Sequence, residues 1–312
     1  MAHKLTIFVF VLLCIGGFAC AAPGPCKGPE TLETQVLTDP SARTWGALGG
    51  WFGERHDYSC AIPAFESAVK LDPDSARMHY FLGLSLYSSG QVDPSIAELR
   101  RSVELDSNDV QARLALGVAY HQLGHAADAE AAWESALAID PNSTTALDWL
   151  AKARIADGQF GAAIELLSSA PADENLTLDL ALAHSESGSF DKAADTLSAS
   201  LAQSPGALRV ATALATVYVQ SHRYQDATNL IRATLNAHPN DAATELLYLR
   251  LLVLQDDDAD AEPIAQKMLA EHPQDFDALY LSGVVENDER QYALAVEHLQ
   301  AAALRERVSV LA

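Results

Sequence analysis

Two histidines come closest to the spacing of a chemical site. His121 and His125 are four residues apart, so on one helix both imidazoles would face the same side and could share a metal ion. The glutamate of the His-Glu-x-x-His pattern is missing, and the sequence has neither a glycine-rich phosphate loop nor a Gly-x-Ser-x-Gly nucleophile motif. We therefore interpret the pair as a polar helix end and expect no catalytic activity.

An acidic run is the second candidate. It comprises Asp256, Asp257, Asp258, Asp260 and Glu262. A calcium loop alternates its ligands and needs a central glycine for its sharp turn, and this run has no glycine. We interpret the run as a solvated turn with acidic residues at the start of a helix, and we expect neither a metal nor another cofactor.

The amino terminus has the features of a secretory signal peptide. Lys4 gives a positive start, residues 5–15 are apolar, and Ala19-Cys20-Ala21 fits a signal-peptidase site. We expect residues 1–21 to be removed and the protein to be periplasmic or extracellular. No other run approaches the roughly twenty apolar residues of a membrane span, so no integral membrane segment is expected after cleavage. The alternatives are an uncleaved anchor, a buried helix, or a lipid on Cys20, although Phe18 departs from the lipoprotein pattern.

Two cysteines, Cys26 and Cys60, follow the expected cleavage point. No Cys-x-x-Cys motif or Cys/His cluster accompanies them, which disfavours zinc and thioredoxin-like chemistry. In an exported chain we expect them to form a disulfide. Closing a loop of about 35 residues would contribute roughly 4 kcal/mol in the chain-entropy model, as an upper figure. Two free thiols are the alternative.

Composition limits the class of protein. The 312 residues carry a formal net charge of -22, which argues against binding to nucleic acid or to an anionic membrane surface. Nearly half the residues are apolar, at 49%, so a core can be buried and general disorder is excluded. Alanine and leucine dominate, which favours helices.

Small and large apolar residues recur at a spacing of 34 residues. The clearest periods contain Trp45, Leu48, Gly49, Phe52, Ala61, Phe65, Ala68 and Pro73; then Leu82, Gly83, Leu86 and Leu99; then Leu116, Gly117, Tyr120, Ala129, Trp133, Ala136 and Pro141. This pattern resembles the tetratricopeptide repeat (TPR) family, and weaker periods extend the resemblance over about residues 42–305. The resemblance implies an all-α, right-handed α-solenoid of about eight helix-turn-helix units with a concave groove.

The expected organisation follows from these periods. After the signal peptide we expect a Pro/Gly-rich lead at 22–41, repeats at 42–75, 76–109, 110–143, 144–173, 174–207, 208–241, 242–275 and 276–305, and a tail at 306–312. The fourth repeat is about four residues short, so a local break is expected there. Left-handed caps are expected where the first helices end, at Gly90, Gly124, Gly158 and Gly188.

The resemblance also implies which residues face the groove. These are Arg43, Arg77, Tyr80, Leu84, Tyr87, Gln111, Leu114, Val118 and His121. We expect the tyrosines to be binding anchors, whereas packing between repeats is the alternative for Leu84, Leu114 and Val118. In the first repeat, Gly46, Gly50 and Gly53 are expected to leave the inner face bare, open either to a partner or to the chain's own lead.

The resemblance and the missing catalytic motifs together predict a non-catalytic, exported scaffold that binds a peptide or protein segment in its groove. The chaperone-binding clamp of the family is absent, because its positions hold residues such as Gly46, Gly50 and Leu84. The alternative is a structural or assembly factor of the cell envelope that acts through the array ends and the convex face. The last repeat is expected to expose an apolar face that supports self-association, formed by Leu281, Val285, Val296, Leu299 and Leu304.

Overall fold

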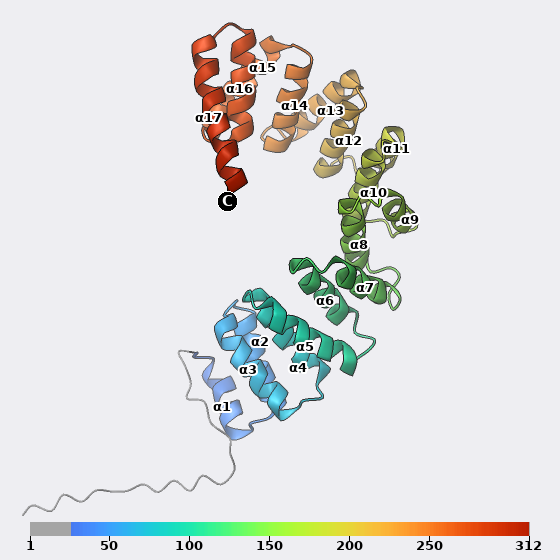
Figure 1. The fold of residues 1–312 in the computed structure, drawn as a ribbon, viewed down its shortest axis with the longest axis vertical. Helices are drawn as coiled ribbons and strands as arrows, with labels where there is room; N and C mark the ends of the chain where they lie inside the picture. The colour runs from blue at the N-terminus through green and yellow to red at the C-terminus, as the bar shows by residue number, and fades with distance from the viewer. Residues whose placement is uncertain (1–25, 312) are drawn as a thin grey trace, which may run out of the picture. The chain divides into compact units, whose positions relative to one another are not determined.

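The chain is all α-helical over the part that the structure describes. A computed structural model describes the backbone of residues 26–311 and the side chains of residues 26–305, and this part contains seventeen helices and no strands (Figure 1). The signal peptide expected at residues 1–21 lies outside the described residues. The described chain divides into two compact units, one ending at Ser107 and the other beginning at Asn108.

The first unit contains five helices. They are α1 (Glu30–Thr38), α2 (Ala42–Gly53), α3 (Tyr58–Leu71), α4 (Ala76–Ser88) and α5 (Val92–Leu105). Helix α2 packs against α3 and α4 against α5, while α4 also contacts α2 and α3. These contacts place α2 and α4 side by side as the first helices of two successive pairs.

The second unit contains twelve helices. They are α6 (Val110–Gln122), α7 (Ala126–Leu137), α8 (Thr144–Ala156), α9 (Phe160–Ser168), α10 (Glu174–Glu186), α11 (Phe190–Gln203), α12 (Leu208–Gln220), α13 (Tyr224–Ala237), α14 (Ala242–Leu254), α15 (Asp258–Glu271), α16 (Phe276–Asp288) and α17 (Tyr292–Leu311). Within this unit each helix packs against helices one or two places along the chain. The even-numbered helices α2 to α16 begin at the first residues of the eight expected repeats.

Each helical pair turns through one residue with a positive φ. In four turns this residue is one of the expected glycines, with φ between 73° and 83°: Gly90, Gly124, Gly158 and Gly188. In the other four it is a larger residue, with φ between 53° and 66°: His56, His222, Asp256 and Arg290. The left-handed region costs a non-glycine residue roughly 1–2 kcal/mol. The tight turn is therefore kept even where its sequence signal is missing.

Small residues in the first helix of a pair let the second helix approach closely. A Cβ added to Gly83 would lie 2.7 Å from Cγ of Leu99, and one added to Gly49 would lie 2.9 Å from the Phe65 ring. Leu99 and Phe65 are both buried, so the glycine and its partner act as a matched small–large pair.

The lead expected at 22–41 contains a helix, because Glu30–Thr38 forms α1. Its buried Val36 joins the core of Leu48 and Phe52, and Leu32 packs against the same cluster. Two acidic residues in its first turn, Glu30 and Glu33, favour a helix at that point. Helix α1 therefore covers an apolar face of the first pair.

The short fourth repeat does not interrupt the second unit, which corrects the expected break. Its second helix, α9, has only 9 residues, but it still buries Ala163 and Leu167. Helix α8 also packs directly against α10, so the contact between successive first helices is kept. The division between the two units falls instead after Ser107.

The apolar face expected at the last repeat is only partly exposed. Leu281 and Val285 are buried, which contradicts the expectation, because they pack into the core that α16 forms with α14 and α15. Leu299 is half-buried and contacts the Gly283 position of α16. Val296 and Leu304 remain exposed, with 54% and 64% of their surface accessible.

None of the helices within residues 26–311 combines the length and the apolar run that a membrane crossing would need.

Candidate functional site

The first unit contains a cleft of about 940 Å³ between α2 and α4. Leu32 of α1 borders it on one side, and Tyr58 and Phe65 of α3 contribute to its lining. A volume of this order is typical of ligand sites, which range over roughly 300–1,000 Å³. The cleft runs along the inner face that the repeat pattern predicts for the first two helical pairs.

Glycines of α2 leave part of the cleft bare. A Cβ added to Gly50 or Gly53 would meet no atom within 4 Å. Gly46 is different, because a Cβ there would lie 2.6 Å from Sδ of Met78 in α4. The bare face expected over all three glycines is therefore limited to Gly50 and Gly53, and we call these two residues the floor of the cleft.

Aromatic and aliphatic side chains line the rest of the cleft. Trp51 packs edge-on against Phe52 at 5.1 Å, and the Arg55 guanidinium lies 3.9 Å above the Trp51 ring. On the α4 side, Phe81 stacks on Phe65 with 5.7 Å between ring centroids. These contacts hold the rings of the cleft walls in place.

Two arginines lie at one end of the cleft. Arg43 and Arg77 are the second residues of α2 and α4, both are exposed, and both line the cleft. Within the described residues neither guanidinium forms an ion pair; Arg77 lies 5.4 Å over the Phe81 ring. Asp72 borders the same end, and Glu54 lies at the other.

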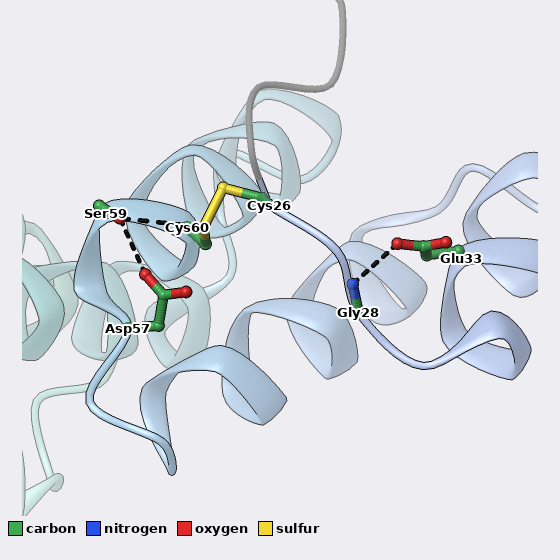
Figure 2. Close-up of a disulfide and its surroundings, with 6 residues drawn as sticks. All are labelled: Cys26, Gly28, Glu33, Asp57, Ser59 and Cys60. Atoms are coloured by element: carbon green, nitrogen blue, oxygen red, sulfur yellow. Dashed lines mark hydrogen bonds between the residues drawn. A yellow bond between two sulfur atoms is a disulfide. The ribbon is translucent and has the colours of Figure 1, made fainter.

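A disulfide fixes the lead beside this cleft. Figure 2 shows the disulfide between Cys26 and Cys60, whose sulfur atoms are 2.06 Å apart. The backbone N–H of Gly28 donates a hydrogen bond of 2.7 Å to Glu33, which folds the loop onto the first turn of α1. A Cβ on Gly28 would lie 2.6 Å from Leu48, so this loop lies against α2. The pair of cysteines expected to bond is the pair that the structure joins.

The remaining groove residues of the first unit have mixed positions. Leu84 lines the cleft and is half-buried. Tyr80 and Tyr87 are also half-buried, but they are not part of its lining, and the Tyr80 ring lies 5.3 Å from Phe81. The pattern did not single out Trp51, which lines the cleft; its place beside Gly50 was the available signal.

The groove residues of the second unit lie on α6. Gln111 and His121 are exposed, Val118 is half-buried, and Leu114 is buried. Leu114 belongs to the core around Trp133, so the packing alternative holds for it and its expected groove role is wrong. The His121 ring lies 5.9 Å from Trp133 and 5.8 Å from Trp149.

A charged cluster joins α8, α10 and α12. Asp179 is only 7% exposed, and burial, together with a hydrogen bond and the negative charge of Asp148, raises its pKa to about 7. Lys152 and Arg209 act in the opposite direction and favour the carboxylate. Lys152 donates a 2.7 Å hydrogen bond to Asp148. Burial therefore moves the titration of Asp179 from the acidic range towards neutral pH.

The two motifs considered for metal binding lie at helix ends. His121 is near the end of α6, and His125 precedes α7, where its ring lies 4.0 Å from Asp128. Asp256 occupies the turn before α15 with φ 53°. Within the described residues, no three His, Cys, Asp or Glu side chains are grouped so that they could hold a metal ion.

Comparisons with known proteins point to one repeat family. Residues 54–136 match the model of anaphase-promoting complex, cyclosome, subunit 3, and residues 184–251 match a tetratricopeptide repeat model. A tetratricopeptide repeat protein from Parabacteroides merdae has a similar structure, with a TM-score of 0.56 and 13% identity, covering 82% of this chain and 99% of that one. The fold is therefore an all-α helical repeat of the tetratricopeptide type.

Curated relatives match only short segments. Cellulose synthase operon protein C of Escherichia coli (strain K12) is 42% identical over 67 residues, which is 22% of this chain and 6% of that protein. PEX5-related protein of Homo sapiens is 34% identical over 73 residues, which is 23% of this chain and 12% of that protein. The chain spans a small fraction of the length of these relatives.

Proposed function

We propose that this helical repeat is a non-catalytic, exported scaffold that holds a segment of a partner protein in the cleft between α2 and α4. The observation that carries the proposal is the open glycine floor at Gly50 and Gly53, where an added side chain would meet nothing within 4 Å. A bare backbone surface with preformed apolar walls allows a second chain to approach closely.

Packing accounts for Gly49 and Gly83 of the same unit but not for the two cleft-lining glycines, Gly50 and Gly53. Gly49 and Gly83 lie under large side chains, which explains why these two positions hold the smallest residue. Glycine inside a helix costs roughly 0.5–1 kcal/mol relative to alanine. At Gly50 no close packing compensates for this cost, so a role in binding is the better explanation.

Export is part of the proposal. The apolar run at residues 5–15 and the Ala19-Cys20-Ala21 site favour removal of a leader and a periplasmic or extracellular location. The bond between Cys26 and Cys60 supports this assignment, because disulfides persist mainly in oxidising compartments. Attachment of a lipid to Cys20 is the less favoured alternative.

A second candidate function is assembly through the surface of α16 and α17. Phe276 and Tyr280 stack there with 5.9 Å between ring centroids, and Tyr280 is 46% exposed. Tyr292 and Val296 of α17 are exposed as well, at 60% and 54%. These exposed apolar side chains favour self-association or an envelope assembly role.

Binding assays with cleft-filling variants test the proposal. Leucine at Gly50 and Gly53 adds side chains to the floor at positions where an added Cβ meets nothing within 4 Å, and leucine at Gly161 of α9 is the matched control because a Cβ there also meets nothing within 4 Å. Partners captured from an envelope extract are identified by mass spectrometry, and their affinities are measured for each variant. The proposal requires loss of binding in the Gly50→Leu, Gly53→Leu protein and normal binding in Gly161→Leu. Equal binding by both proteins would contradict it.

A further inference from the structure

The arginines at the cleft differ from a related arginine elsewhere in the repeats. Arg209 is the second residue of α12, as Arg43 and Arg77 are of α2 and α4. Its guanidinium is neutralised by Glu174 at 3.2 Å and also donates a hydrogen bond of 2.8 Å to Asn175. Within the described residues, Arg43 and Arg77 form no such ion pair. Two cations at equivalent positions are thus left available in a chain with a net charge of -22.

The charges are also ordered along the cleft. Arg43 and Glu54 both line the cleft and are eleven residues apart in the sequence. Along the axis of α2 this spacing corresponds to a distance of about 16 Å. An extended chain covers this distance with about five residues. The glycine floor lies towards the Glu54 end, flanked by Trp51.

We propose that the cleft recognises an extended acidic segment of its partner, with an aspartate or glutamate side chain between Arg43 and Arg77 and a large apolar side chain over the Gly50–Gly53 floor. This inference rests on the proposed binding function and names the chemistry of the ligand. Arginine forms bidentate hydrogen bonds with a carboxylate, so two unpaired guanidinium groups select that group over an amide. Asp72 borders the same end without an ion pair to either arginine, so Arg43, Arg77 and Asp72 together carry a net charge of +1 there, which favours an anionic ligand.

The chain's own amino terminus does not have this chemistry. Residues 1–25 contain no aspartate or glutamate and include Lys4, so they offer nothing to the arginine pair. A second copy of the chain offers acidic segments such as Asp256-Asp257-Asp258. Binding of that segment in trans is an outcome that the experiment separates from binding of a different protein.

Selection from a peptide library tests the ligand chemistry. The purified protein is used to select from random twelve-residue peptides that are displayed with both ends joined to the carrier, so that no free carboxyl terminus is present. The selection is repeated with three variants: Arg43→Gln, Arg77→Gln; Gly50→Leu, Gly53→Leu; and the Gly161→Leu control. The best peptide is then synthesised with amidated ends, together with a copy in which asparagine or glutamine replaces each acid, and the dissociation constants are measured.

We expect selected peptides to be enriched in an acidic residue a few positions from a large apolar one. The synthetic peptide should bind the Arg43→Gln, Arg77→Gln protein at least tenfold more weakly than it binds the parent protein. Replacing the acidic residues of the peptide should weaken binding to the parent protein by a similar factor. The affinity of the original peptide should also fall as the salt concentration rises. Peptides that need the glycine floor but show no acidic preference would overturn this inference and leave the proposed function intact. Peptides that bind Gly50→Leu, Gly53→Leu as well as Gly161→Leu would overturn both. Enrichment of sequences like residues 256–258 with concentration-dependent dimerisation would make a second copy the ligand and overturn the assignment to a different partner.

Discussion

A Cβ added to Gly117 of α6 would lie 2.2 Å from Nε1 of Trp133 in α7. Trp133 has no exposed surface, and its indole N–H has no hydrogen-bond partner within the described residues. The ring therefore lies in a site that is shaped by the absence of a side chain at Gly117. This glycine–tryptophan pair is the tightest of the small–large contacts between paired helices.

Alanine at Gly117 should therefore destabilise the second unit. Overpacking of a dense core typically costs about 1–3 kcal/mol, which exceeds the roughly 1 kcal/mol that alanine contributes to helix stability. The matched control is Gly161→Ala, where the Cβ meets nothing and stability should stay the same or increase. Urea unfolding followed by circular dichroism measures both changes, and a stable Gly117→Ala protein would contradict the packing argument.

The turn residues give a second pair of opposite changes. Gly124 has φ 74°, so Gly124→Ala should lower the free energy of unfolding by about 1 kcal/mol. Arg290 has φ 66° in the equivalent turn before α17, and Arg290→Gly should be neutral or stabilising by up to about 1 kcal/mol. The midpoints of urea unfolding compare the two. A large loss of stability in Arg290→Gly would show that its side chain stabilises the turn.

Stability should also depend on pH through Asp179. Its pKa is raised from 3.8 to about 7 in the folded protein, mainly by burial. The unfolded chain loses this proton near pH 4, whereas the folded chain keeps it to about pH 7, so the contribution of Asp179 to the free energy of unfolding falls as the pH rises between these values. The loss is at most about 4 kcal/mol, because one pKa unit corresponds to about 1.4 kcal/mol.

Asp179→Asn removes the titrating group but keeps an N–H that can donate to Asp148. We expect this variant to be less sensitive to pH between 5 and 8 than the parent protein, and to be more stable than it at pH 8. Asp191→Asn, at an exposed position of α11, is the control and should leave the pH dependence unchanged. Parallel pH profiles for the parent and Asp179→Asn would show that Asp179 does not retain its proton.

The disulfide should protect the first unit in particular. Replacing both cysteines, Cys26→Ser with Cys60→Ser, should lower the stability of the first unit by about 2–4 kcal/mol. Hydrogen exchange should become faster in α1, whereas exchange in the second unit should not change. Alkylation of both thiols without reductant in protein taken from the exported fraction would contradict the presence of the bond in the cell.

Self-association should depend on the exposed surface of α17. Val296→Asp with Leu304→Asp places charges on that surface and should shift the protein to the monomer in sedimentation experiments at high concentration. Leu37→Asp is the control, because Leu37 is 82% exposed on α1. A parent protein that is monomeric at all concentrations would contradict the proposed association.

Much of the fold could be predicted because repeats restrict sequence strongly at a few positions. Gly83 lies under Leu99 as the period predicts, and Gly90 adopts the expected left-handed turn. The equivalent turns at His56 and Arg290 carry no glycine that would signal them. These residues still adopt a positive φ, at some cost in conformational free energy. Helix α1 is not predicted from the sequence, because residues 22–41 are interpreted as a Pro/Gly-rich lead.

The site was harder to predict than the fold. A repeat pattern gives the face of a helix on which a residue lies, but not how far the neighbouring repeat covers that face. Leu114 is buried in the core around Trp133 for this reason, whereas Tyr80 at the corresponding position of the preceding repeat is only half-buried. Whether Gly46 stays bare depends on the rotamer of Met78, which sequence alone does not specify.

The position of the disulfide has a mechanical consequence. The bond between Cys26 and Cys60 encloses α1 and the whole of α2, with a sequence separation of 34 residues. If tension were applied to the two ends of the chain, the force would pass through the bond, and roughly 115 Å of contour length would be withheld from extension. Helix α4 lies outside the loop and has no such protection. Under load α4, which carries Arg77, would therefore be pulled away and the cleft would be lost. Helix α2, which carries Gly50 and Gly53, would stay within the loop closed by the disulfide.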